Sequence, residues 1–329
     1  MIQSRSPLRA VTSQSPCNVC GKPDWCTRSE DGEVSICMRT SNGGKQTRNG
    51  GYFYLNVDPA ERTAYVRPDN PKTTVAQRDK AYSAFLDRCP LEPDHAEHLR
   101  SVRRLSEDTI TRCQFASIPA LAVAMEICDE LEREGIDLDY IPGFYLESHR
   151  RRIKFGGMKG IFIPIRNAQG QITAMQVRRD VAKERRYMLF SSATGRDKEG
   201  KSFDLLRGAS SGVPPHYARP WRVADRVCIT EGPLKAEIAA EIIDAPFVGL
   251  VGVGTFDQNF GWRLRTDFPN LKSAAIAYDA DAATNDAVAL QRDRLEAALR
   301  DARIETSILS WDLDQGKGID DFLISQEGL

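Results

Sequence analysis

An α/β fold with a parallel sheet is predicted for the C-terminal part of the chain. Three short apolar runs, at 226–230, 247–253 and 274–278, are bounded by turn residues, as buried strands of a parallel sheet are. Between the first two runs, residues 234–243 place their apolar side chains on one helical face. The resulting β-α-β-α-β order is typical of open α/β sheets, which bind ligands at the carboxyl ends of their strands.

Acidic residues stand at two of these strand ends. Glu231 closes the first run, and Asp279 and Asp281 close the last. Neighbouring carboxylates repel one another by about 4 kcal/mol per close pair at an effective dielectric near 20, and a divalent cation removes that repulsion. Hard oxygen ligands suit Mg²⁺ or Mn²⁺. The alternative is that Asp279 and Asp281 cap the next helix, but the three acids together favour a metal site.

This arrangement resembles the TOPRIM domain, the catalytic module shared by DnaG-type primases, type IA and II topoisomerases and some nucleases. The resemblance rests on two motifs, Glu231-Gly232 at one strand end and Asp279-x-Asp281 at a later one. The resemblance implies a Rossmann-like parallel sheet in which Glu231, Asp279 and Asp281 hold the catalytic metals.

Two further positions bear on those metals. Residues 316–323 resemble the acidic motif at the end of primase TOPRIM domains, which implies that Asp320 or Asp321 supports the site. DnaG-type primases also have an acid four residues beyond the glutamate, whereas this chain has Lys235 there. The number and arrangement of the metals could therefore differ from those of DnaG-type primases.

Composition and charge indicate a globular protein of about two domains. The 329 residues are 41% hydrophobic and 28% charged, and no apolar run approaches a membrane span or a signal peptide core, so a cytoplasmic protein without a membrane partner is expected. The net charge is −1, yet residues 147–190 hold eleven Lys/Arg against three acids, and residues 274–329 hold five against twelve. This distribution of charge suits a protein that holds a polyanion near a metal cluster. The alternative is that the basic and acidic regions are two solvated faces that pair with each other.

The N-terminal region contains a cysteine-rich segment. Residues 1–16 are polar and patternless, and are expected to be disordered. Residues 17–58 are predicted to form a zinc-ribbon-like domain, because a Cys-x-x-Cys-Gly knuckle is followed by a strand that returns another cysteine to it. Four cysteines are the expected ligands of a structural zinc ion, the third with irregular spacing: Cys17, Cys20, Cys26 and Cys37. A redox Cys-x-x-Cys pair is the alternative, but it lacks the βαβ setting that such a pair needs.

This knuckle resembles the N-terminal zinc-binding domain of phage, plasmid and bacterial primases, which is thought to read template DNA. It departs from their Cys-His-Cys-Cys order because it has no histidine. Basic and aromatic residues interleaved after it could contact phosphates and stack on bases, or pack the small domain instead. The other four cysteines lie in apolar contexts and are expected in the core: Cys89, Cys113, Cys128 and Cys228.

A linker over 59–75 is predicted to lead into a subdomain over 76–215. Its first part is helical, with helices expected from residue 76 and at 94–103, 107–114 and 119–134. The segment Leu99–Ser106 is similar to the start of a primase polymerase domain. His95 and His98 have no metal partner at usable spacing and are expected at the surface.

Residues 160–179 are predicted to form a hairpin with its turn at 167–170. They resemble the primase polymerase-domain segment in which Ile-Pro-Ile-Arg-acid-x-x-Gly precedes a strand ending in arginine. The resemblance implies that basic residues line a cleft beside the metals, where arginine suits phosphate oxygens. These are Lys154, Arg166, Arg178, Arg179, Arg185 and Lys235. Simple surface exposure is the alternative for any one hairpin arginine.

Residues 195–202 fit the P-loop pattern G-x-x-x-x-G-K-[ST]. A P-loop must open a helix whose amide groups cradle phosphate, and the apolar piece that follows reaches only Leu206. An irregular connection over 191–215 is therefore favoured over an ATPase site.

A helix over 285–301, a strand over 304–309 and a return towards the metals at 317–323 complete a predicted TOPRIM domain of residues 216–329. From the order of its motifs, the chain is identified as a member of the TOPRIM DNA primases, with an α+β polymerase subdomain between the zinc-binding and TOPRIM domains.

The resemblance implies synthesis of short RNA primers on single-stranded DNA from nucleoside triphosphates, by two-metal nucleotidyl transfer. It also implies a phage, plasmid or integrated-element origin, a structural Zn²⁺, catalytic Mg²⁺ or Mn²⁺, and a replicative helicase acting in trans. A TOPRIM nuclease or nicking enzyme, and a non-catalytic single-stranded DNA-binding replication factor, are the alternatives.

Overall fold

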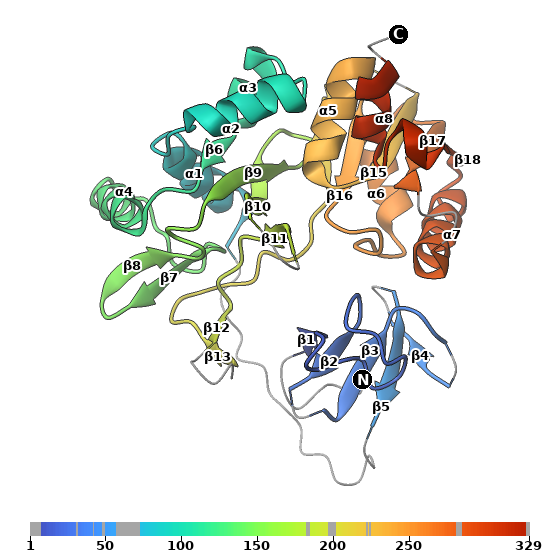
Figure 1. The fold of residues 1–329 in the computed structure, drawn as a ribbon, viewed down its shortest axis with the longest axis horizontal. Coiled ribbons are helices and arrows are strands. Elements are labelled where there is room, and N and C mark those ends of the chain that lie inside the picture. The colour runs from blue at the N-terminus through green and yellow to red at the C-terminus, as the bar shows by residue number, and fades with distance from the viewer. Residues whose placement is uncertain are drawn as a thin grey trace.

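The computed structural model shows an N-terminal sheet, a central α+β subdomain and a C-terminal α/β domain (Figure 1). It describes residues 8–30, 32–41, 43–47, 50–56, 73–181, 185–196, 202–221, 223, 225–280 and 285–326. Within these residues, no helix is both long enough and apolar enough to cross a membrane.

The N-terminal sheet is antiparallel, with strand order β1-β2-β3-β5-β4. Its strands are β1 (Leu8–Ala10), β2 (Thr27–Ser29), β3 (Val34–Cys37), β4 (Lys45–Gln46) and β5 (Tyr52–Leu55). The expectation of disorder over 1–16 is wrong for 8–16, because β1 pairs with β2 and Val11 is fully buried against the cysteines. Residues 1–7, and most of the predicted linker, lie outside the described residues.

The central subdomain begins with helices that are fixed by side-chain caps. Thr74 and Gln77 form a capping box at the first helix, and the Ser106 side chain accepts a hydrogen bond from the Thr109 amide at the third. The helical elements are α1 (Val75–Leu86), α2 (Pro93–Glu97), a π-helical turn (His98–Val102), α3 (Glu107–Cys113) and α4 (Leu121–Arg133).

A four-stranded sheet of order β11-β10-β9-β6 lies among these helices. Its strands are β6 (Ala116–Ser117), β9 (Gly160–Arg166), β10 (Ile172–Arg179) and β11 (Tyr187–Leu189), and smaller hairpins are β7 (Phe144–Glu147) with β8 (Arg150–Ile153) and β12 (Thr194–Arg196) with β13 (Ser202–Asp204). Strands β9 and β10 confirm the predicted hairpin, since they are antiparallel and Gly170 N–H donates to the Asn167 carbonyl at 2.9 Å. Ser202 lies in a strand and opens no helix, in agreement with the rejection of a P-loop, but the connection over 191–215 is less irregular than expected because it contains the β12–β13 hairpin.

The C-terminal domain has the predicted open α/β sheet, of order β14-β16-β15-β17-β18, in which only β14 is antiparallel. Its elements are β14 (His216–Ala218), β15 (Arg226–Glu231), α5 (Pro233–Ile243), β16 (Phe247–Leu250), α6 (Phe260–Asp267), β17 (Ser273–Ala277), α7 (Asp286–Asp301), β18 (Glu305–Ile308), a 3₁₀ turn (Leu313–Gln315) and α8 (Ile319–Gln326). Helices α5 and α8 pack against one face of the sheet, and α6 and α7 pack against the other.

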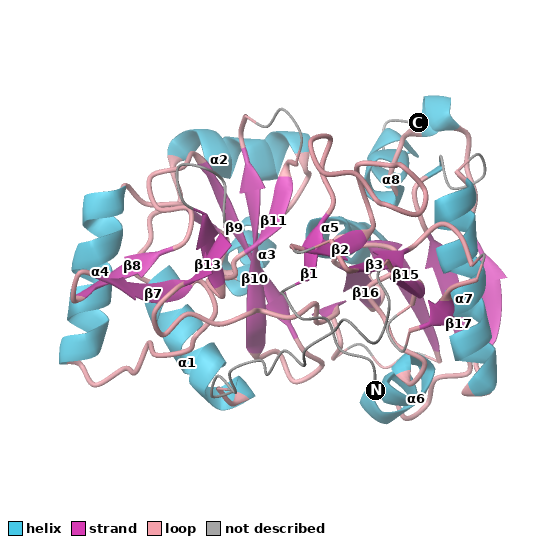
Figure 2. Ribbon diagram, turned by 90° about the horizontal axis from the view of Figure 1, so that it is seen from below, coloured by secondary structure: helices cyan, strands magenta, loops and turns pink. Residues whose placement is uncertain are grey.

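A shared core joins the central and C-terminal domains. On one face of the central sheet, Phe162 and Val177 share a core cluster with Phe85 of α1 and Leu131 of α4. On the other face, Ile161 and Ile163 belong to a cluster that includes Leu234 and Ile238 of α5. The N-terminal sheet lies below these two domains in Figure 1 and in front of them in Figure 2, and a side chain at Gly50 would collide with Arg294 of α7.

Candidate active site and zinc site

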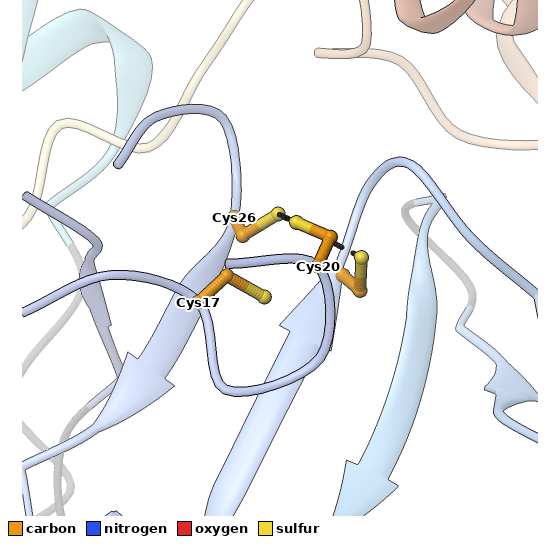
Figure 3. Close-up of side chains that lie close together, drawn as sticks. Cys17, Cys20 and Cys26 are labelled. Carbon is orange, nitrogen blue, oxygen red and sulfur yellow. Dashed lines mark hydrogen bonds between the residues drawn. The ribbon is translucent and has the colours of Figure 1, made fainter. Parts of the chain in front are cut away.

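Four cysteine sulfurs converge in the N-terminal sheet (Figure 3). All four Sγ atoms lie within 4.8 Å of one another, with Cys20–Cys26 at 3.7 Å and Cys26–Cys37 at 3.9 Å. A tetrahedral zinc ion with Zn–S bonds of about 2.3 Å separates its sulfurs by about 3.8 Å. The knuckle forms because Gly21, at φ +69°, donates its N–H to the Cys17 carbonyl at 2.8 Å. The four cysteines therefore fit a structural zinc ion, with the irregularly spaced Cys26 included.

Backbone and side-chain donors surround these sulfurs. The Met38 amide lies 3.4 Å from Cys26 Sγ, and Arg39, which pairs with Asp24 at 2.6 Å, reaches the same sulfur at 3.8 Å. Burial raises the pKa of the Cys26 and Cys37 thiols. Zinc must therefore replace their protons when it binds, and the donors around the site stabilise the resulting thiolates.

Two predicted metal-ligating acids lie at neighbouring strand ends of the C-terminal sheet. Glu231 ends β15, and Asp279 follows β17, which pairs directly with β15. The Ala280 amide donates to the Lys317 carbonyl at 2.9 Å, so the start of α8 is tied to the same edge and Asp320 is buried beside it. We call Glu231, Asp279 and Asp320 the acidic centre; Asp281 lies outside the described residues.

Lys235 lies within this acidic centre. Its Nζ pairs with Asp279 Oδ1, while Lys317 Nζ lies 4.0 Å from the other oxygen of the same carboxylate. Burial alone would lower the pKa of Lys235. The surrounding carboxylates, of which Asp279 has the largest effect, instead raise that pKa above its usual value, and Asp320 and Glu231 contribute to the rise. The position that departs from the primase pattern thus supplies a cation among the acids.

Arg103 neutralises the acidic residues that begin α8. Its Nη1 lies 3.0 Å from Asp320 Oδ2 and 3.5 Å from Asp321 Oδ1. Burial raises the pKa of Asp320, and the nearby Lys235 and Arg103 counteract that shift. Arg103 was not among the predicted site residues. It lies in the segment Leu99–Ser106, whose resemblance to primases was the one sequence signal that could have identified it.

A basic cluster of His98, Arg103 and Arg178 lies beside the acidic centre. Arg178 is opposite Ile161 in the register of β10 and β9, so it lies on the sheet face that contacts α5. Its side chain is buried, and its Nε has no hydrogen-bond partner among the described residues. Burial and the charges of Arg178 and Arg103 lower the pKa of His98 to about 4, so this imidazole is neutral at pH 7.

The two histidines were expected at the surface, and that expectation is wrong. Both are half-buried: His95 lies in α2, and His98 begins the π-helical turn. His95 Nε2 lies 3.0 Å from an Asp180 oxygen, and its Nδ1 lies 2.6 Å from Ser117 Oγ. Asp180 is in turn 4.0 Å from Arg178 Nη1. His95 therefore holds Asp180, which in turn faces Arg178 of the basic cluster.

The other predicted basic residues make their hydrogen bonds with partners outside the acidic centre. Arg179, on the opposite face of β10, donates to the Arg185 carbonyl at 3.3 Å. Four such bonds are Lys154 to Thr194 O (2.8 Å), Arg185 to Val11 O (3.4 Å), and Arg166 to Gly170 O (2.7 Å) and to Gln114 Oε1 (2.6 Å). Of the six predicted basic residues, Lys235 lies in the acidic centre and Arg178 beside it. A nucleic-acid role for all six stays a prediction.

A buried ionic network joins the two domains behind the site. Glu237, on α5, lies 2.9 Å from His216 Nε2 and 3.0 Å from Arg112 Nη2 of α3. Because His216 Nδ1 accepts the Arg166 amide at 3.1 Å, Nε2 carries the proton and donates it to Glu237. Burial opposes a charge on Glu237, but the bond from His216 and the guanidinium of Arg112 lower its pKa to about 2. No sequence pattern linked these residues.

Replacing Glu237 by glutamine should destabilise the protein by about 3 kcal/mol at neutral pH, because it removes the charge partner of a buried ion pair. The pKa of Glu237 is lower in the folded protein than its ordinary value of 4.5, so its ionised carboxylate stabilises the folded state above pH 4.5. That stabilisation is lost as the pH falls towards 2. Urea unfolding at pH 7 and pH 3 should therefore show a smaller difference at pH 3. Glu107→Gln, at an exposed ion pair, is the control, with an expected change of about 0.5 kcal/mol or less. Equal stability of Glu237→Gln and wild type at pH 7 would refute this role.

The architecture of this chain is similar to that of known proteins. Residues 221–328 match a family of domains of unknown function, DUF3854. No curated protein sequence matches the chain. The structure of the Aquifex aeolicus primase, comprising its zinc-binding and RNA polymerase domains, is similar with a TM-score of 0.56 at 16% identity, over 98% of this chain and 78% of that one.

Two further primase structures are similar over the central and C-terminal domains. The RNA polymerase domain of Mycobacterium tuberculosis primase DnaG has a TM-score of 0.54 at 14% identity, covering 78% of this chain and 81% of that one. A DnaG primase catalytic domain bound to single-stranded DNA has a TM-score of 0.51 at 18% identity, covering 78% and 77%. The chain therefore has the fold of DnaG-type primases across nearly its whole length, which confirms the predicted fold class.

Proposed function

We propose that this protein is a DNA primase, which synthesises short RNA primers on single-stranded DNA by metal-dependent nucleotidyl transfer. The observation that carries this proposal is Arg103, which joins the basic cluster to the acidic centre within a primase fold. A polyanionic substrate needs donors for its phosphates next to carboxylates for its metal, and this site has both.

The donor chemistry of the site fits a divalent cation. Carboxylate oxygens at a strand end are the ligands that Mg²⁺ and Mn²⁺ prefer, and Glu231, Asp279 and Asp281 would hold the ion. Such an ion, when bound, polarises a phosphoryl oxygen. Asp279 Oδ2 would contribute, because Oδ1 is paired with Lys235.

The basic cluster would bind the triphosphate of the incoming nucleotide. Arg178 is suited to this role, since a guanidinium donates two parallel hydrogen bonds to phosphate oxygens and its Nε lacks a described partner. Arg103 would hold the same phosphates against the start of α8. The zinc-binding domain would select the template, and a replicative helicase of the same phage, plasmid or integrated element would act in trans.

Replacing Arg178 by alanine should weaken nucleotide binding by about 10- to 100-fold, which is the usual effect of losing a charge-assisted hydrogen bond. The measurement is the affinity for a non-hydrolysable nucleoside triphosphate in the presence of template. Arg150→Ala, at an exposed arginine of β8 that pairs with Asp129, is the control and should bind nucleotide within about twofold of wild type. Equal weakening in both variants would contradict the assignment of Arg178.

Primer synthesis tests the proposed function directly. Wild type and Glu231→Gln are incubated with a mixed-sequence single-stranded template, labelled nucleoside triphosphates and Mg²⁺ or Mn²⁺. Short labelled products that disappear in the variant establish a primase. Template cleavage without nucleotides, lost in the same variant, would identify a TOPRIM nuclease instead, and unaltered DNA binding without either reaction would identify a binding factor.

A further inference from the structure

We propose that Lys235 takes the place of a second divalent cation, so that the acidic centre binds one such ion and not the two expected from the resemblance. This inference rests on the proposed function, because it concerns the metal complement of the same site. The side chains that the structure brings together do not fit the two metals that the resemblance implies.

The position of Lys235 is fixed by the chain around it. Gly232, at φ +91°, turns the chain from β15 into α5, so that Lys235 in the first turn of the helix points back towards the strand ends. A Cβ on Gly318 would collide with Asp320 Oδ1 and would lie 2.9 Å from Lys235 Nζ. The glycine therefore lets the ammonium approach the buried carboxylate closely.

The carboxylates are engaged by protein cations where a second metal would need them. Lys235 takes one oxygen of Asp279, and Arg103 takes one oxygen of Asp320 and approaches Asp321. Over the described part of the chain, the four cysteines are the only group of three or more side chains close enough to share a metal ion. Of the described acids, Glu231, Asp279 and Asp320 are thus arranged around an ammonium group and do not form such a group among themselves.

A second dication at this place would have to displace Lys235. Its side chain is 23% exposed, and that of its partner Asp279 is 11% exposed, so the ammonium cannot turn into solvent without breaking a largely buried ion pair. A dication and an ammonium close together also repel each other strongly. Asp279 Oδ2, which the largely exposed Lys317 approaches only to 4.0 Å, and the carboxylate of Glu231 at the neighbouring strand end are enough to begin the ligand set of one ion.

Counting bound Mn²⁺ tests this inference without any catalytic readout. Zinc-loaded full-length protein is titrated with Mn²⁺ in the absence of DNA and nucleotide, and free Mn²⁺ is measured by electron paramagnetic resonance. Wild type should bind one Mn²⁺ per chain. Lys235→Asp, which restores the acid of the primase pattern, should bind two. Lys272→Asp, at an exposed lysine, makes the same change of charge and should bind one.

A second variant keeps the test decisive if Lys235→Asp does not fold. Lys235→Met retains an apolar stem of similar length, and it should bind its first Mn²⁺ at least 10-fold more tightly than wild type, because the competing cation is gone. Two Mn²⁺ ions on wild type, none on wild type, or unchanged Mn²⁺ binding in a folded Lys235 variant would each overturn the inference. A wild type that makes primers yet binds two ions would refute this inference alone, whereas one that binds a single ion but makes no primers would refute only the proposed function.

Discussion

Asp279→Asn should reduce primer synthesis by about 10³-fold, the largest catalytic effect that we expect of a single substitution. The carboxylate lies at the end of the central strand pair, and it is the residue that contacts Lys235 as well as the expected metal. Loss of one preorganised charge aimed at the reacting group commonly costs about 10²- to 10³-fold, and here a metal ligand would also be lost. Asparagine keeps the size of the side chain, so packing is preserved.

The matched control for this variant is Asp314→Asn, which makes the same change at an exposed residue of the 3₁₀ turn and should leave synthesis unchanged. Both variants are compared with wild type in primer yield and in melting temperature. Retention of more than about a tenth of the wild-type yield in Asp279→Asn would contradict metal-dependent chemistry at this centre.

Part of the loss could come from Lys235, which Asp279→Asn leaves without its charged partner. The double variant Asp279→Asn/Lys235→Met separates the two effects, because residues in direct contact are expected to be non-additive. If Asp279 acts as a metal ligand, the double variant remains inactive. Recovery of primer synthesis in the double variant would show instead that an unpaired lysine had blocked the site.

Features with a local sequence signal were predicted well. Apolar runs between turn residues identified the parallel strands, and Glu231 and Asp279 fall at adjacent strand ends because parallel strands place their carboxyl ends together. The Cys-x-x-Cys-Gly knuckle requires only a tight turn at Gly21, so the zinc site was also within reach. These predictions depend on residues that are close in sequence or on a regular alternation.

Features that depend on contacts across the chain were missed. Arg103 and Asp320 are 217 positions apart, and Arg112 and Glu237 are 125 apart, so no spacing rule connects them. Their pairing follows from the packing of α5 against the central sheet, which only the tertiary structure defines. Strand β1 was missed for a similar reason, since only its pairing with β2 identifies Leu8–Ala10 as a strand.

Lys235 lies between these two cases. The sequence showed that a lysine replaces an acid at this position. A lysine that is simply exposed on the helix surface would give the same sequence. The register of β15 and β17 brings Asp279 to it, and the loop that carries Gly318 brings Asp320. A departure from a family pattern therefore gained a physical interpretation only when its surroundings were known.

Removal of the zinc ion should unfold the N-terminal sheet while the rest of the protein stays folded. The small cluster formed by Val11 and the buried cysteines cannot replace the stabilisation by zinc, which is about 10–16 kcal/mol for structural sites in small domains. The central and C-terminal domains have extensive cores of their own. Cys37→Ser removes a fully buried ligand and should lose the bound zinc.

Zinc content and limited proteolysis measure this outcome together. Cys37→Ser should contain less than about a tenth of an equivalent of zinc, and protease should digest its N-terminal sheet while sparing the domains that follow. Cys228→Ser, a half-buried cysteine of β15, is the control and should keep one zinc and the wild-type digestion pattern. If the zinc domain selects the template, Cys37→Ser should also make at least 10-fold fewer primers while still binding Mn²⁺ as wild type does. Full zinc content in Cys37→Ser would exclude a four-cysteine site.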